Sequence, residues 1–96
     1  MKLLDLDPHW FAVEQGGRPV GVSFLCPHCR SARLAVAFHH AGHEVIDDTY
    51  IRAHAPQTNH IWMATGETFE NLTLSPSVDA SQTGHWHGFV TNGEIR

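Results

Sequence analysis

A cysteine pair between two strand-like segments constrains this chain more than any other feature of its sequence. Cys26 and Cys29 are separated by two residues, and the chain has no other cysteine. Residues 20–24 before them and residues 33–38 after them have the apolar patterns of β-strands. The cysteines are therefore predicted to lie on a strand–turn–strand corner. A chain of 96 residues has room for one domain around that corner.

The Cys-x-x-Cys pair has three interpretations, which stay open at this point. A tight turn could aim both thiolates at one zinc ion, as in a zinc knuckle. A thioredoxin-like redox pair would need a helix N-terminus and a βαβ setting. A structural disulfide would be unusual in the cytosol. The strand expected after Cys29 favours the knuckle, and some of the nine histidines would then complete the four ligands of a structural zinc site.

The other apolar segments are also short, which predicts a mainly β domain. Asn92-Gly93 is the dipeptide most typical of a tight hairpin turn. Residues 39–43 resemble a turn, whereas residues 44–55 fit a short helix or a loop with one strand. Further strands are expected at residues 60–64, 72–74, 86–90 and 94–96.

We therefore expect residues 1–96 to form a single small domain. Its fold would be an antiparallel sheet or sandwich of about six short strands, with a zinc knuckle and at most one short helix. So thin a core would gain stability from a bound metal.

Charge and hydropathy exclude two classes of partner. The formal net charge is −4, whereas binding driven by nucleic-acid phosphates requires a basic face. No apolar run approaches the roughly 18 residues of a membrane-spanning helix. Acidic residues stand near the N-terminus where a signal peptide needs an apolar core, so we expect a cytoplasmic protein.

Three further pieces of sequence, together with the upstream Phe-x-Cys-Pro-x-Cys, carry a resemblance to a known family. They are Trp62 followed by Gly66, residues 69–78 with Thr-Leu-Ser-Pro-Ser-Val, and residues 85–95 with His-Trp-His-Gly-Phe-Val-Thr-Asn-Gly. In this order they resemble a small domain family of tailed phages and bacteria. Relatives occur in bacterial ubiquitin-like conjugation operons. The resemblance covers about residues 22–96.

The resemblance implies a serine peptidase or isopeptidase, similar to a deubiquitinase, with a Ser-His-Glu triad. The nucleophile would be Ser77, the general base His87 and the orienting acid Glu70, with Glu67 in reserve. The partner would be a ubiquitin-like protein, cleaved at its C-terminal tail or released from its conjugates. The setting would be the cytoplasm of a bacterium or of a phage-infected host cell.

The residues permit this chemistry and also have simpler interpretations. A serine hydroxyl needs a base within hydrogen-bond reach, and the base needs a carboxylate to orient it. If residues 72–77 and 85–90 are adjacent antiparallel strands, Ser77 and His87 approach each other, with a bend near Pro76. Alternatively, Ser77 is a turn serine, His87 a strand histidine or metal ligand, and Glu70 a solvated carboxylate.

The zinc site departs from the family pattern. Many members have a histidine soon after the second knuckle cysteine, where this chain has Arg30-Ser31-Ala32-Arg33. Many also have a cysteine before the catalytic-type histidine, and His85 could replace it, because imidazole is also a good zinc ligand. The metal ligands would then be Cys26, Cys29 and His85. The fourth would be water or one of His28, His39, His43 and His60.

Two other functions compete with the serine peptidase. One is a non-catalytic zinc-binding β domain that acts as an accessory interaction module. The other is a zinc hydrolase in which a metal-bound water attacks and Glu67 or Glu70 serves as base. Chelators would inactivate the hydrolase, whereas serine-directed inhibitors would inactivate the peptidase.

Overall fold

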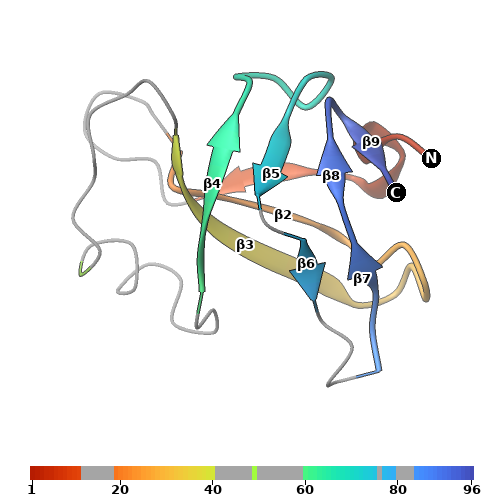
Figure 1. Cartoon of the computed structure of the whole chain (residues 1–96). Coiled ribbons are helices and arrows are strands. Elements are labelled where there is room, and N and C mark those ends of the chain that lie inside the picture. The colour runs from red at the N-terminus through yellow and green to blue at the C-terminus, as the bar shows by residue number, and fades with distance from the viewer. Residues whose placement is uncertain (12–18, 41–48, 50–59, 76, 80–83) are drawn as a thin grey trace.

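A twisted five-stranded sheet forms the body of the domain (Figure 1). The computed structural model describes residues 1–11, 19–40, 49, 60–75, 77–79 and 84–96. The strands of the sheet follow the order β1-β2-β3-β4-β5 and are β1 (His9–Phe11), β2 (Gly21–Leu25), β3 (Arg33–His40), β4 (Ile61–Thr65) and β5 (Thr73–Ser75).

Two small antiparallel pairs accompany this sheet in the described part of the chain. One joins β6 (Val78–Asp79) to β7 (His87–Gly88), and the other joins β8 (Val90–Thr91) to β9 (Glu94–Ile95). The 3-10 helix η1 (Leu3–Leu6) precedes β1. Strand β8 lies beside β5, so the C-terminal segment adjoins the free edge of the main sheet (Figure 1).

The hairpin of β2 and β3 carries the cysteine corner, as predicted. The two strands pair antiparallel in the register Phe24↔Leu34 and Leu25↔Arg33. Cys26 begins the turn immediately after β2, and its N–H donates to the carbonyl of Ala32 at 2.7 Å. The local apolar pattern was sufficient to place this corner.

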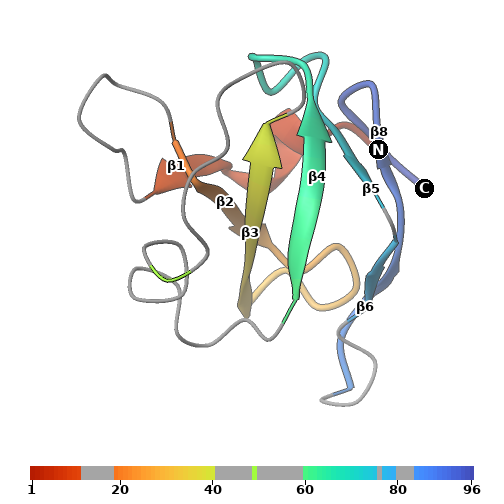
Figure 2. The same cartoon turned by 60° about the vertical axis from the view of Figure 1, so that its left-hand side comes forward.

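One strand pair differs from the antiparallel sheet that the sequence predicted. Strands β3 and β4 run parallel, with Phe38 opposite Trp62, so the sheet is mixed (Figure 2). A parallel pair requires a long crossover connection, and residues 41–60 separate the two strands. The chain therefore enters β4 from the same end as β3, which leaves β5 to return antiparallel beside it.

The core draws on the main sheet, on η1 and on the small pairs β6–β7 and β8–β9. Eleven buried side chains form one cluster, to which η1 contributes two leucines. They are Leu3, Leu6, Val22, Phe24, Val36, Phe38, Ala64, Leu72, Leu74, Val78 and Val90. The N-terminal segment is held against the C-terminal hairpin by backbone hydrogen bonds, such as Ile95 N–H to the carbonyl of Met1 at 2.8 Å.

Most strand predictions are confirmed, with differences at the ends. The expected strand 86–90 is divided at Phe89 into β7 and β8, and β3 continues through His39 and His40, which were predicted to be part of a turn. Strands β1 and β6 were not predicted. The remainder of the expected turn and all but residue 49 of the ambiguous segment 44–55 lie outside the described residues.

The Asn-Gly turn is also confirmed. Asn92 and Gly93 have φ angles of 50° and 75°, the left-handed backbone that a type I′ hairpin turn requires at both central positions. Within the described ranges, no helix has the length and apolar character needed to cross a membrane.

The buried Phe24 and the exposed Phe89 offer a matched test of this core. Phe24 has no exposed surface, whereas 53% of Phe89 is exposed. Phe24→Ala should lower the free energy of unfolding by about 3–5 kcal/mol, a large share of the roughly 5–15 kcal/mol of a typical domain. Phe89→Ala should change it by less than about 0.5 kcal/mol. Urea denaturation measures both, and equal losses would contradict this assignment of the core.

Candidate functional site

The turn between β2 and β3 brings the two cysteine sulfurs together. The N–H of Arg30 donates to the carbonyl of Cys26 at 2.7 Å, and Arg30 has a φ of 58°, so the chain turns back sharply just after Cys29. Cys26 is buried and Cys29 is exposed, and both are free thiols. The turn thus presents two sulfur donors from one side of the molecule.

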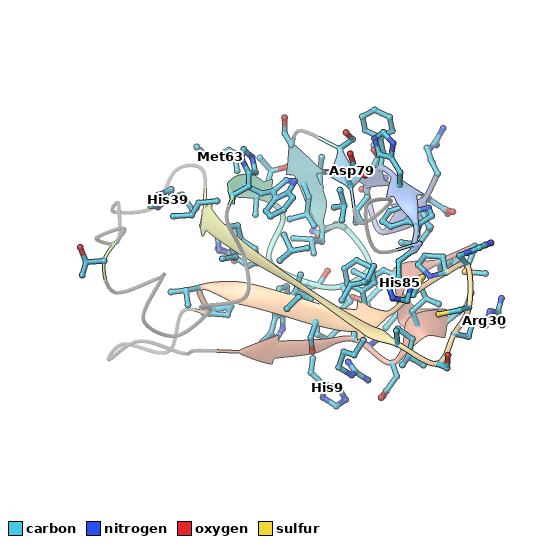
Figure 3. All side chains as sticks on the ribbon, turned by 90° about the horizontal axis from the view of Figure 1, so that it is seen from below. His9, Arg30, His39, Met63, Asp79 and His85 are labelled. Atoms are coloured by element: carbon cyan, nitrogen blue, oxygen red, sulfur yellow. The ribbon has the colours of Figure 1, made fainter. Side chains whose placement is uncertain are left out.

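His85 approaches this turn from a distant part of the sequence. Its Nδ1 lies 3.7 Å from the Sγ of Cys29, and one donor atom from each of Cys26, Cys29 and His85 lies within 4.8 Å of the other two. Figure 3 shows His85 on the side of the molecule that carries the turn with Arg30. The structure therefore brings together the three metal ligands that the sequence predicted.

This donor set could hold a metal ion. Two thiolates and an imidazole are ligands that zinc and other soft or borderline metals take. His28, His39 and His60 belong to the described residues and lie outside the cluster, whereas His43 is not among the described residues. The described part of the chain therefore supplies three donors.

The turn also lowers the pKa of the Cys29 thiol. The backbone N–H groups of Ser31 and Ala32 and the Ser31 hydroxyl stabilise the thiolate, and they lower the pKa of the Cys29 thiol from 9.0 to about 6. The thiolate is the form of cysteine that binds metals. The same turn that positions the sulfur thus favours its ligating form.

Ser77, just before β6, and His87, on β7, form a second pair. The Oγ of Ser77 lies 3.2 Å from the Nε2 of His87. Ser77 stands just before β6, and its carbonyl accepts a hydrogen bond of 3.1 Å from the indole Nε1 of Trp62 on β4. The main sheet therefore fixes the backbone of the serine, and the β6–β7 ladder places the histidine beside it.

The two histidines of the His-Trp-His segment serve different clusters. His85 lies before β7 and faces Cys29, whereas His87 lies within β7 and faces Ser77. Trp86 between them packs edge-on against Phe24 of the core, with ring centroids 6.2 Å apart. His85 lies before β7 begins, so the two histidines contact different partners in the structure.

The acidic residues that the resemblance implies lie in the loop between β4 and β5. Glu67 and Glu70 fall between Thr65 and Thr73, which face each other at the loop end of the ladder. The Glu70 carbonyl lies against Gly93 of the β8–β9 turn. Ser77 lies beyond the opposite end of that ladder. No hydrogen bond or ion pair joins Glu70 to His87 in the described structure.

A family comparison bears directly on these clusters. The family model described as bacterial ubiquitination-like system serine protease (BubE) matches residues 4–96. The chain belongs to this family. No curated protein and no solved structure matches it. The match extends over the N-terminal residues that the sequence resemblance left out, which agrees with the packing of η1 into the same core.

Membership in the BubE family places the chain among the serine proteases of bacterial ubiquitination-like systems. The sequence did not reveal how β6 presents Ser77, although Ser77-Val78-Asp79 alternates polar and apolar residues as a half-buried strand does. It also gave no sign that the Trp62 indole holds the serine backbone. Both features depend on pairing between distant segments.

Metal binding should depend on His85 and not on His87. Cys29→Ser and His85→Ala each remove a ligand, so each should weaken affinity by more than the roughly 10- to 100-fold that loss of an outer-shell partner costs. His87→Ala should leave affinity unchanged. Cobalt(II) titration, read by the thiolate-to-cobalt absorption band, measures all three. A loss in His87→Ala as large as in His85→Ala would contradict this assignment.

Proposed function

We propose that the chain is a zinc-stabilised serine peptidase or isopeptidase that cleaves at the C-terminal tail of a ubiquitin-like protein or releases it from conjugates. The observation that carries the proposal is the 3.2 Å contact of Ser77 Oγ and His87 Nε2 in a BubE family member. The peptidase would act in the cytoplasm of a bacterium or of a phage-infected host cell.

Ser77 would attack the carbonyl carbon of the scissile bond, and His87 would take the hydroxyl proton at Nε2. His87 would then return that proton to the leaving amine, which leaves the tail acylated on Ser77. Water activated by the same imidazole would hydrolyse the ester and restore the hydroxyl. The β6–β7 pairing supports this order of reaction steps, because it would hold the base and the nucleophile together before substrate binds.

Zinc is the metal we propose for Cys26, Cys29 and His85. Zinc is redox-inactive, and its structural sites are built from thiolates and imidazoles, as in a set of two cysteines and two histidines. When bound, it would crosslink the β2–β3 turn to the segment just before β7. The role of these three residues is then to fix the start of β7 and so the position of His87, two residues further along the chain.

The three-donor cluster also favours one alternative. Catalytic zinc sites keep three protein ligands and an open position for water, and the described residues supply three. A zinc hydrolase of this kind would tolerate Ser77→Ala and would lose activity when the metal is removed. A non-catalytic interaction module would cleave no substrate, with or without Ser77 and with or without the metal.

Covalent labelling of the zinc-loaded protein with a fluorophosphonate tests the proposal. Labelling should map to Ser77, disappear in Ser77→Ala, and slow by about 10²- to 10⁴-fold in His87→Ala, the usual contribution of a general base. Ser75→Ala is the matched control, because Ser75 is exposed on β5 two residues away. Intact mass and peptide mapping give the readout.

Absence of labelling in a folded, zinc-loaded protein would contradict the serine mechanism. Cleavage of a ubiquitin-like protein extended by a short C-terminal peptide then separates the alternatives. Activity that survives Ser77→Ala but not chelation would indicate the zinc hydrolase, provided that circular dichroism shows the chelated protein to be folded.

A further inference from the structure

The outer face of the β6–β7 pair gathers a group of side chains that goes beyond the serine and histidine. Asp79 is directly opposite His87 in the antiparallel register, and Val78 is opposite Gly88. Val78 and Gly88 are buried, whereas Asp79 and His87 are exposed. Because side chains alternate along a strand, Ser77, Asp79 and His87 project from the same, outer face.

The register puts His87 within reach of both of its neighbours on the opposite strand. Directly opposite residues of an antiparallel pair have Cβ atoms about 4.5–5.5 Å apart, and diagonal neighbours are within reach of long or aromatic side chains. Ser77 is the diagonal neighbour, and the imidazole reaches it with Nε2, the nitrogen far from the backbone. Nδ1 is the ring nitrogen nearer to the His87 backbone, and Asp79 is the residue directly opposite that backbone.

We propose that Asp79 is the positioning carboxylate of this site. It would accept a hydrogen bond from Nδ1–H of His87, which keeps Nε2 unprotonated and directed at Ser77, and it would stabilise the imidazolium that forms during attack. This inference rests on the proposed serine peptidase and names the acid of that site. Figure 3 shows Asp79 at the pair of small strands, away from the metal cluster marked by His85.

The loop acids are placed less favourably for this task. Glu70 and Glu67 belong to the loop that closes the β4–β5 ladder beyond Thr65 and Thr73, whereas Ser77 follows β5 at its other end. Asp79 is set directly opposite His87 by the β6–β7 ladder. The short aspartate side chain suits a directly opposite partner.

The test compares Asp79→Asn, Asp79→Glu and Glu70→Gln by the rate of fluorophosphonate labelling at Ser77 in zinc-loaded protein. Asp79→Asn should reduce the maximal labelling rate by about 10²- to 10⁴-fold, because the amide favours the wrong tautomer, and should leave the half-saturating probe concentration unchanged. Asp79→Glu should restore part of the rate. Glu94→Gln, which also removes one negative charge, is the control for general electrostatics.

The outcomes separate this inference from the function it rests on. Normal labelling of Asp79→Asn, with Ser77→Ala and His87→Ala inactive, would overturn the role of Asp79 and leave the serine mechanism standing. A slower labelling rate in Glu70→Gln, with a normal rate in Asp79→Asn, would assign the role of positioning carboxylate to Glu70. Absence of labelling in the unmodified protein would overturn both.

A spectroscopic measurement keeps the inference testable if a variant folds poorly. Long-range ¹H–¹⁵N correlation identifies which imidazole nitrogen carries the proton. The unmodified protein should show the Nδ1–H tautomer at His87, and folded Asp79→Asn should shift toward Nε2–H. An Nε2–H tautomer in the unmodified protein would overturn the inference without any activity assay.

Discussion

The contact between Cys29 and His85 is the constraint on which the arrangement of the site depends. It joins a turn near the start of the main sheet to a segment 56 residues further along the chain, just before β7. Strand β7 is two residues long and, among the described residues, pairs with β6 alone, so its own ladder holds it weakly. The imidazole–thiol contact and the Trp86–Phe24 packing anchor that strand from its N-terminal side.

The serine half of the site is anchored differently. Ser77 follows the sheet's last strand, and the Trp62 indole holds its carbonyl from β4. Val78 then inserts into the core between Ser77 and Asp79, which fixes the direction of both polar side chains. Ser77 and His87 are thus supported by separate parts of the fold, and they meet where two short strands pair. The Cys26–Cys29–His85 cluster adjoins the segment that leads to His87 and does not include Ser77.

The sequence predicted the features that depend on local patterns. The cysteine corner between two alternating segments, the Asn92-Gly93 turn and the mainly β class follow from neighbouring residues, and the family pattern indicated Ser77 and His87. The parallel pairing of β3 with β4 was not predictable, because it depends on the path of the chain between them. Strand β6 is too short to show periodicity. The pairing of Asp79 with His87 depends on register between distant segments.

The wide sequence separation of the three residues that could hold a metal has a consequence for synthesis. A growing chain presents Cys26 and Cys29 early, when two of the three donors of this cluster are present. The third donor, His85, stands 56 residues beyond Cys29, so it is synthesised after the strands of the main sheet. A metal could therefore engage all three donors only after the hairpin and the rest of that sheet have been made. Retained metal would mark chains whose C-terminal strands have docked, which are also the chains that carry His87 beside Ser77.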